Sequence, residues 1–305
     1  MDKILQTLLE KVAGLHEVPE GAYNIRANGQ TESRRVTANI DIETRADGSG
    51  IDVHIKPDTK RESVHIPVIL SRTGLTETVC NDFFVGDGAE VTIVAGCGIH
   101  NSGAGESRHD GLHRFFIGKN AKLKYVEKHY GEGGGSGGRI MNPRTEITIE
   151  DGGSMEMETV QIKGIDSTKR ETVAHLKAGA RLIVQERLMT HESQTAESRF
   201  DVFMDGEGAS ANIISRSVAR DRSEQMFFSN LIGNAASAGH TECDAIIMAH
   251  AKISSLPEIT ANHPDAALIH EAAIGKIAGE QIIKLMTLGL SEEEAEAQIV
   301  NGFLK

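Results

Sequence analysis

A repeat of about 29 residues constrains this chain more than any other feature of its sequence. Seven times after residue 80, a short turn leads to a small residue and then to a run of alternating polar and apolar residues. A period of 20–50 residues is typical of repeat architectures. The small residues are Ala89, Ala121, Ser154, Ala180, Ala209, Ala236 and Ala266.

The units predict a β-helix, because they contain strands and turns without a helical pattern. A propeller blade needs roughly 40 residues and usually carries aromatic side chains. Aromatic residues make up only 4% of this chain, and it has no tryptophan. Each turn of a β-helix buries its apolar face only against its neighbour, so the stack forms one elongated domain.

Other patterns flank the repeat. Apolar residues at helical spacing over residues 4–12 predict a helix, and residues 17–36 are polar and are expected to be irregular. Alternation over residues 40–55 predicts a hairpin. Two helices are expected after residue 277, the second with a capping box at Ser291 and Glu294. The predicted organisation is an N-terminal helix and irregular segment (1–36), a β-helix core (37–277) and a C-terminal helical segment (278–305).

Composition excludes several classes of protein. The net charge of −12 disfavours nucleic acid as a partner, because phosphate binding needs a basic face. No run of about 18 apolar residues predicts a membrane span. An odd number of widely spaced cysteines, with no signal peptide, favours free thiols in the cytoplasm. With no tryptophan and no export signal, a carbohydrate-active enzyme is disfavoured as well.

One low-complexity run, residues 131–139 (GEGGGSGGR), could cradle a phosphate or serve as a flexible loop. Neither Gly-Lys-Ser nor Gly-Lys-Thr follows it, and no helical pattern does, so a flexible loop is favoured. The chain also lacks a dinucleotide fingerprint, a nucleophile elbow and a closely spaced cysteine pair. It is therefore not expected to be an enzyme that works alone.

The last two repeats carry candidate metal ligands. His240 and His270 each lie four residues after the small residue of their repeat, whereas Cys243 lies seven and Glu271 five residues after it. If the strands stack in that register, the histidines lie one above the other, about 4.8 Å apart. Cys243 and Glu271 then share the opposite face. These residue types suit a soft metal or an iron–sulfur cluster. The alternative is a histidine ladder beside a cysteine that fills the core.

Cys97 is the second candidate. Gly96 and Gly98 flank it and are expected to expose its thiol, and His100 follows three residues on. A metal ligand and a polar loop are the two interpretations. Cys80 is expected to be structural.

Four stretches resemble the SufB/SufD family, which forms the scaffold of the SUF machinery for iron–sulfur cluster assembly. They are residues 243–248 (CDAIIM), 270–277 (HEAAIGKI), 285–295 (LMTLGLSEEEA) and 299–304 (IVNGFL), and Gly96-Cys97 adds to them. The resemblance covers roughly residues 75–305. It is closest to the short stand-alone form of minimal SUF systems.

The resemblance implies a right-handed parallel β-helix that dimerises, as a homodimer or a SufB/SufD-type heterodimer. It implies a transient cluster, expected to be [4Fe–4S], at the subunit interface with Glu271 and His270. With Cys243 as a thiolate ligand, His240 and Cys97 complete the candidate set. Larger SufB proteins carry a cysteine where this chain has Ala251, so a SufD-like partner that holds no cluster is the alternative.

The resemblance also implies that a SufC-like ABC ATPase binds the terminal helices and alone handles ATP. The helices could equally cap the open end of the solenoid, and both roles are compatible. The expected ATPase-binding residues are Ile282, Leu285, Met286, Leu290, Ile299 and Phe303.

Overall fold

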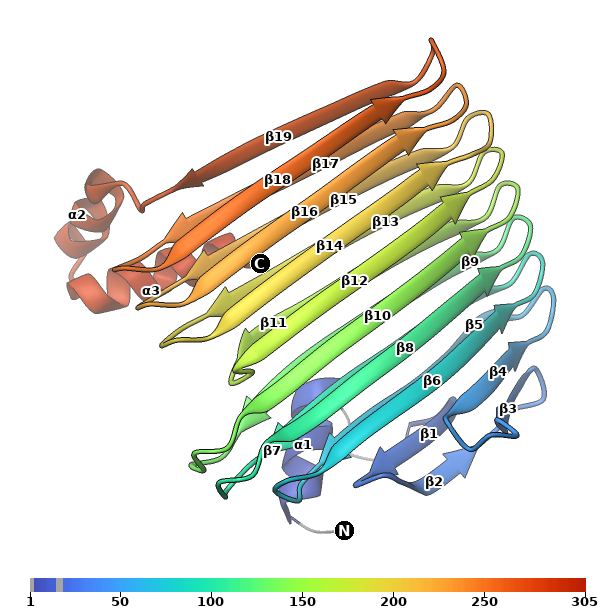
Figure 1. Ribbon diagram of the computed structural model, residues 1–305, viewed down its shortest axis with the longest axis horizontal. Helices are drawn as coiled ribbons and strands as arrows, with labels where there is room; N and C mark the ends of the chain where they lie inside the picture. The colour runs from blue at the N-terminus through green and yellow to red at the C-terminus, as the bar shows by residue number, and fades with distance from the viewer. Residues whose placement is uncertain (1–2, 15–18) are drawn as a thin grey trace.

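The computed structural model describes residues 3–14 and 19–305 and consists mainly of two facing sheets of parallel strands (Figure 1). From the C-terminal edge, sheet A contains β19 (Ala267–Gly275), β17 (Ala238–Ile247), β15 (Ser210–Ala219), β13 (Arg181–Thr190), β11 (Ser154–Lys163), β9 (Lys122–Glu132), β7 (Glu90–His100), β5 (Lys60–Leu70), β1 (Ala22–Ala27) and β2 (Gln30–Arg35). Sheet B contains β18 (Lys252–Ala261), β16 (Glu224–Gly233), β14 (Thr195–Met204), β12 (Ser167–Leu176), β10 (Arg139–Ile149), β8 (Ser107–Ile117), β6 (Thr76–Val85), β4 (Ile51–Ile55) and β3 (Ile40–Thr44).

Successive strands from β4 onward alternate between the sheets, so each strand pairs with the strand two positions later in the chain. Arg181 of β13, for example, pairs with Ser210 of β15, which pairs with Ala238 of β17. The predicted parallel β-helix is therefore confirmed. Alternate side chains point between the sheets, where large apolar residues such as Phe83, Phe115 and Phe200 are fully buried.

The small residues that begin the repeats form a column, but two positions differ from the sequence prediction. Lys122 pairs with Ser154 and Ala238 with Ala267, so the residues equivalent to Ala121 and Ala266 are Gly153 and Ser237. Ser154 and Ala236 are therefore each one residue out of the predicted register. Turns of different length change which residue occupies the first position of a repeat, and the alternation of polar and apolar residues does not reveal this change.

The N-terminal region partly differs from its prediction. α1 (Lys3–Ala13) and the β3–β4 hairpin form as expected. Residues 22–35 were expected to be irregular, which is wrong, because β1 and β2 form an antiparallel pair there. β1 also pairs in parallel with β5 and thus extends sheet A. Residues 17 and 18 lie outside the described residues.

α1 lies against the outer face of sheet A, where two glycines of β7 make room for it. Leu8, Leu9 and Val12 are buried there beside Ile69. A Cβ atom on Gly96 would lie 2.5 Å from the Val12 carbonyl oxygen, which is far too close. The glycines on either side of Cys97 therefore make room for a helix, and the prediction that they expose the thiol is wrong.

The glycine-rich run also has a packing role. Gly133, Gly135 and Gly137 lie directly against the backbone of residues 101–105, where a Cβ atom would come within 2.3 Å of carbonyl oxygens. The buried Asn101 side chain donates to the carbonyl groups of Gly105 and Gly137 at 2.8 and 3.1 Å. The run forms a loop, as predicted, and its stacking on residues 101–105 requires close backbone approach.

The chain ends in α2 (Gly279–Thr287) and α3 (Glu292–Phe303), and the predicted capping box at Ser291 and Glu294 is present. Val300 and Leu304 pack against Val218 of β15. Both helices lie beside the ends of the strands, so they leave the last strands β18 and β19 uncovered (Figure 1). Across the described ranges, no helix has the length and apolar character that crossing a membrane requires.

Candidate functional site

The last two strands of sheet A place the predicted ligands in a different register from the expected one. His240 pairs with Ile269, and His270 pairs with Thr241. The two histidines are therefore not stacked, and they point to opposite faces of the sheet. The residue equivalent to Ala266 is Ser237 and not Ala236, so the predicted register was one residue out. A shift of one residue turns every side chain of a strand to the other face.

Cys243 and His270 belong to the inner face, at the open end of the β-helix. Cys243 is 1% exposed, and it follows Ser215 in the same inward row of sheet A. Burial raises the pKa of the Cys243 thiol, while the hydroxyl of Ser255 on β18 lowers it. The Nδ1 atom of His270 is buried without a hydrogen-bond partner among the described residues. Partial burial and His240 lower the pKa of His270.

His240, Glu242 and Glu271 belong to the outer face. One donor atom from each lies within 4.8 Å of the other two, and His240 Nε2 is 3.6 Å from Glu271 Oε2. Glu242 and Glu271 are register partners on β17 and β19. Burial and the neighbouring Asp244 raise the pKa of Glu242. The prediction that Cys243 and Glu271 share a face is therefore wrong.

Glu242 and Ser255 were not predicted from the sequence. Glu242 lies two residues after His240, and period-two alternation alone would have placed both on one face. Ser255 could not be found in this way, because it comes from the opposite sheet.

Cys97 is buried inside the β-helix, 4% exposed, between Val68 and His129 in the inward row of sheet A. The expectation of an exposed thiol is wrong. Burial raises the pKa of Cys97 well above the usual value, and the carboxylates of Glu127 and Glu77 raise it further.

A row of buried polar side chains runs along the inner face of sheet A toward Cys243. From β9 to β17, the stacked residues are Glu127, Thr159, Glu186, Ser215 and Cys243. The hydroxyl of Ser215 donates to Glu186 Oε2 at 2.7 Å, which connects that carboxylate with the residue beside Cys243.

The buried charges in this interior are paired. Arg170 Nη1 donates to Glu127 Oε2 at 2.5 Å, and its Nε lies 3.9 Å from Glu186. His129 Nε2 lies 3.6 Å from Glu127 Oε1, and the Tyr125 hydroxyl donates to the same oxygen at 3.0 Å. These contacts hold the pKa of Glu127 well below its usual value, although burial opposes them.

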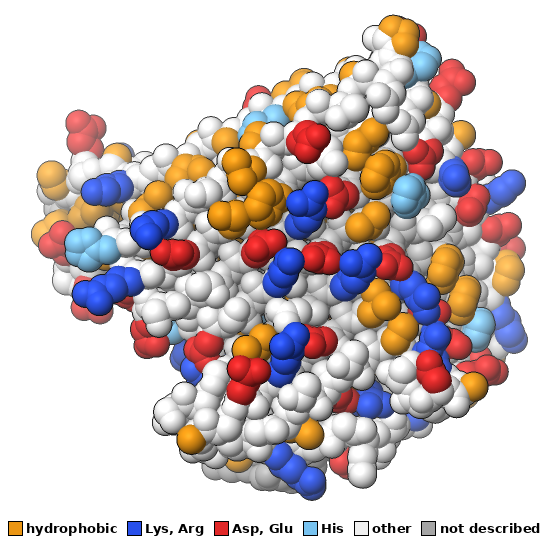
Figure 2. All heavy atoms as spheres, viewed as in Figure 1, with side chains coloured by type: hydrophobic (Ala, Val, Ile, Leu, Met, Phe, Trp, Pro, Cys, Tyr) orange, Lys and Arg blue, Asp and Glu red, His pale blue; other side chains and the backbone are white. Residues whose placement is uncertain are grey.

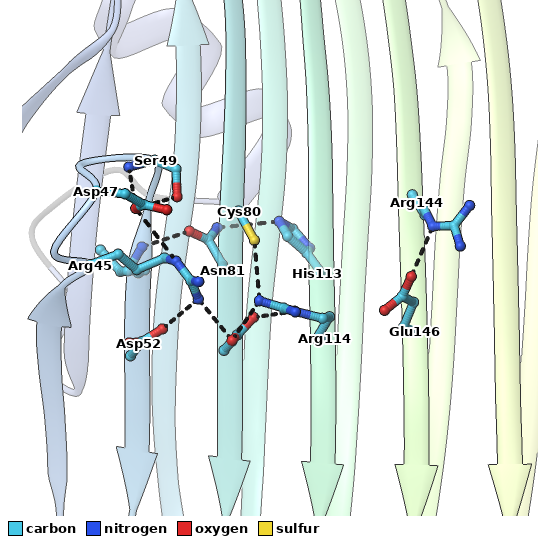
Figure 3. A network of polar contacts seen from close by, with 12 residues as sticks. Arg45, Asp47, Ser49, Asp52, Cys80, Asn81, His113, Arg114, Arg144 and Glu146 are labelled. Carbon is cyan, nitrogen blue, oxygen red and sulfur yellow. Dashed lines mark hydrogen bonds and ion pairs between the residues drawn. The ribbon is translucent and has the colours of Figure 1, made fainter.

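Cys80 lies apart from both groups, on the outer face of sheet B (Figure 3). Arg114 approaches its sulfur at 3.6 Å and forms an ion pair with Asp82, which Arg45 also contacts at 2.8 Å. Asn81, the next residue, points inward to His113. Figure 2 shows acidic and basic side chains interspersed over the same side of the molecule. The network supports the structural role expected for Cys80.

The predicted ATPase-binding residues differ in how exposed their side chains are. Met286 is 43% exposed on α2, and Phe303 packs partly into the cluster of Val218 and Val300. Ile283 and Leu288, which were not predicted, are more exposed than Met286. The remaining predicted residues are half-buried, namely Ile282, Leu285, Leu290 and Ile299.

The sequence matches one family model and several curated proteins. The family model described as "SUF system FeS cluster assembly, SufBD core domain" matches residues 80–303. An iron-sulfur cluster assembly SufBD family protein of Archaeoglobus fulgidus is 32% identical over 231 residues, which cover 75% of this chain and 61% of that protein.

Two other archaeal relatives give similar results. The SufBD family protein of Methanocaldococcus jannaschii is 33% identical over 192 residues, covering 62% of this chain and 60% of the relative. A SufBD family protein of Methanothermobacter thermautotrophicus is 27% identical over 240 residues, which cover 78% of this chain and 57% of that protein. The chain thus spans about three-fifths of the length of these relatives. Since the family model matches well over half of the chain, this protein belongs to the SufBD family of iron–sulfur cluster assembly proteins.

Proposed function

We propose that this chain is a scaffold subunit on which an iron–sulfur cluster is assembled, with no catalytic activity of its own. Cys243 and His270 would hold the cluster at the open end of the β-helix, and a second subunit would complete the ligand set. The observation that carries the proposal is the inward placement of a thiol and an unpartnered imidazole on the last two strands of sheet A. A transient [4Fe–4S] cluster is the expected cargo.

The chemistry of the pair fits this role. A cysteine thiolate is a soft, anionic ligand for iron–sulfur clusters, and imidazole can replace it on iron. Burial disfavours the free thiolate of Cys243, so iron must displace the proton when it binds. One cysteine and one histidine do not fill the coordination of a cluster, which is why a partner is needed.

The open end has the features of a subunit interface. Within residues 19–305, β18 and β19 each have a neighbouring strand on one side only. Leu256, Ile259 and Ile269 are 53%, 42% and 55% exposed there. Exposed apolar edge strands invite pairing with another chain. A second copy, or a related SufB/SufD-type subunit, would cover them and bring its own ligands to the cluster.

The C-terminal helices would bind a SufC-like ABC ATPase. α2 exposes Ile283 and Met286 beside the open end, and its C-cap residue Leu288 is exposed as well, whereas α3 is anchored on β15. ATP would then act only through the partner. The three free cysteines support a cytoplasmic location, because this chemistry requires reduced thiols.

Anaerobic reconstitution with iron and sulfide tests the proposal. The wild type is expected to bind a cluster, seen by absorbance and iron content, and Cys243→Ser and His270→Ala are expected to lose most of it. Cys80→Ser is the matched control, because Cys80 lies on the outer face of sheet B. Full cluster binding by Cys243→Ser would contradict the assignment of Cys243 as a ligand.

The alternative is a SufD-like subunit that supports the complex without holding a cluster. It is favoured by Ala251, which stands where larger SufB proteins have a cysteine and leaves Cys243 as the one thiol near the open end. In that case no form of the chain would bind iron and sulfide, yet ATPase binding would persist and would be lost in Met286→Asp.

A further inference from the structure

A row of aromatic side chains on the outer face of sheet B is divided into two stacks. His54 of β4, Phe84 of β6 and Phe116 of β8 are register partners, and their rings stack with centroids 4.8 and 5.0 Å apart. His175 of β12 and Phe203 of β14 stack in the same way at 4.7 Å. Within each stack the ring planes are nearly parallel, at 6°, 8° and 7° to one another.

A single strand separates the two stacks. β10 places Thr148 between them, where it pairs with Phe116 on one side and with His175 on the other. Because neighbouring strands are about 4.8 Å apart, the rings of Phe116 and His175 lie roughly 9.6 Å apart. One further planar group fits between them. It would lie about 4.8 Å from each ring, a separation at which both rings and cations are attracted to an aromatic face.

The gap opens into a surface hollow of about 280 Å³. Thr148 and Glu150 line the hollow at its β10 end, and the rings of the first stack line it from there to β4. Gly86 and Gly118 belong to the same hollow, and a Cβ atom on either would lie 2.4 Å from a neighbouring atom. The row beside the rings therefore has no side chains at these two positions, which leaves room for a long side chain.

Carboxylates flank the gap. Glu146 and Glu150 lie two residues before and after Thr148, so all three side chains point outward from the sheet. Glu146 is paired with Arg144 at 2.9 Å. Glu150 forms no ion pair among the described residues, although Lys177 follows it in the next strand of the row. A carboxylate without a counter-ion beside two aromatic faces favours a cation in the gap.

The walls of the gap are held in place by their own neighbours. His175 Nδ1 donates to Asp205 Oδ2 at 3.0 Å, since a carboxylate oxygen accepts, and Phe203 supports the far side of this ring. Phe84 supports the far side of Phe116. A ligand that enters the gap therefore meets two rings that are already oriented, which lowers the entropic cost of binding.

A guanidinium group is the cation that matches a flat gap of this width. It is planar and always charged, it stacks on aromatic faces, and its donors bind a carboxylate in pairs. The methylene groups of arginine also pack along apolar surface. The same face of sheet B already holds one such contact within the chain, because the guanidinium carbon of Arg199 lies 5.7 Å from the centroid of the Phe228 ring.

We propose that the gap between Phe116 and His175 binds an arginine side chain of a protein partner. The guanidinium group lies over Thr148 between the two rings, Glu150 accepts its hydrogen bonds, and the methylene groups lie along the hollow. A protein fits this site better than a free small molecule. The hollow lies on an open sheet face where Phe84 and Phe116 remain 36% and 41% exposed, whereas small-molecule sites enclose most of their ligand.

The site lies away from the open end. In sheet B, β12, β14 and β16 separate β10 from the last strand β18. The inference therefore goes beyond the proposed function and does not depend on it. It assigns a binding role to the side of the β-helix, for a partner that the cluster ligands and the C-terminal helices do not contact.

Fluorine NMR of the full chain labelled with 4-fluorophenylalanine tests the proposal. The Phe116 signal is assigned by its loss in Phe116→Leu. The probe is the blocked tripeptide acetyl-Ala-Arg-Ala-amide, and two matched peptides carry citrulline or lysine in place of arginine. Citrulline keeps the planar group without the charge, and lysine keeps the charge without the plane. We expect the arginine peptide to shift the Phe116 signal saturably, with a dissociation constant at least fivefold lower than that of either matched peptide.

Substitutions then locate the site. Thr148→Phe supplies the missing ring and should abolish the shift, and its thermal midpoint should not fall, because the two stacks become one. Glu150→Gln should weaken binding at least threefold. The controls make the same changes on the outer face of sheet A, as Thr92→Phe on β7 and as Glu158→Gln, which removes a carboxylate paired with Lys124. Both controls should bind the arginine peptide as the wild type does.

Several outcomes would overturn the proposal. Equal binding of the citrulline peptide would show that charge is not recognised, and equal binding of the lysine peptide would show that stacking is not. Unchanged binding in a folded Thr148→Phe variant would place the peptide elsewhere. If that variant did not fold, unchanged binding in Glu150→Gln would decide against the site. Free arginine that binds more tightly than the blocked peptide would assign the gap to a small molecule and overturn the protein partner.

Discussion

The interior around Cys97 and the open end around Cys243 contain the same types of residue, but they differ in how far neighbouring strands enclose them. Around Cys97, carboxylates, guanidinium groups and histidines are buried. Glu127 and Arg170 are paired, whereas His109 Nδ1 and Glu77 Oε2 have no hydrogen-bond partner among the described residues. Around Cys243, the last strands are uncovered, and His270 has a buried nitrogen without a partner in the described part of the chain. The difference indicates that the first region stabilises the fold, whereas the second is prepared for a ligand or another subunit.

Removing a buried charge from the closed interior should have the largest effect on stability. Arg170→Met leaves Glu127 buried without its guanidinium partner, so we expect a loss of about 3–5 kcal/mol in the free energy of unfolding. Urea denaturation at fixed protein concentration measures it. Arg144→Met is the control, because its pairs with Glu146 and Glu171 are at the surface and should contribute less than about 1 kcal/mol. Equal losses in the two variants would contradict the contrast between a closed interior and a solvated surface.

Acid should act mainly through the closed interior. Burial, together with His129 and His113, lowers the pKa of His109 from 6.5 to about 3. Between these values the unfolded chain binds a proton that the folded chain does not. Stability therefore falls as pH falls, by up to about 1.4 kcal/mol per pH unit for this group.

Urea denaturation between pH 7 and pH 4 measures this slope. His109→Gln should flatten it, because the proton-binding difference is removed. His270→Gln should change it less, since His270 is only partly buried at the open end. A slope that His109→Gln leaves unchanged would show that this histidine is not kept neutral by the fold.

The three thiols should differ in reactivity toward iodoacetamide. Cys80 should react first, because it lies at the outer surface. Cys243 should react more slowly, since the raised pKa of its thiol and its burial both oppose alkylation. Cys97 should react last, because the edge strand β19 can open locally to expose Cys243, whereas Cys97 lies far from that end. Peptide mass spectrometry after timed quenching gives the order, and early alkylation of Cys97 would show that the interior is not closed.

The smallest effect on stability is expected from the apolar side chains of the open end. Leu256→Ser and Ile269→Ser remove exposed groups, so the free energy of unfolding of the single chain should change by no more than about 0.5 kcal/mol. Light scattering should show a weaker self-association of these variants, because the exposed surface they alter is the proposed interface. A large loss of stability without any change in association would place these residues in the core instead.

Much of the fold could be predicted from the sequence, because a repeat is a local pattern. Alternation at period two indicates strands, and recurrence near 29 residues indicates that they stack. The N-terminal helix, the hairpin at residues 40–55 and the capping box at Ser291 follow from equally local signals. β1 and β2 were missed because they lie outside the repeat and depend on pairing with β5.

The candidate site could be predicted only as a set of residues. The sequence identified Cys243, His270, His240 and Glu271, but it grouped them incorrectly. The turn before β17 is one residue longer than expected, so Ser237 and not Ala236 begins the repeat. As a result, the residues of β17 that were predicted to share a face with given residues of β19 lie on the opposite face. Ser255, which influences Cys243 from sheet B, had no signal in the sequence at all.

By itself, the sequence determined the architecture and the residues that can bind metal, since composition and periodicity act along the chain. The tertiary structure alone decided which of those residues meet. Cys97 is buried inside the β-helix and is not part of an exposed loop. Cys243 and His270 lie on the inner face of sheet A, and His240, Glu242 and Glu271 lie on its outer face. The physical reason is that a strand has two faces, and only the hydrogen-bonded register between neighbouring strands fixes which side chains share one.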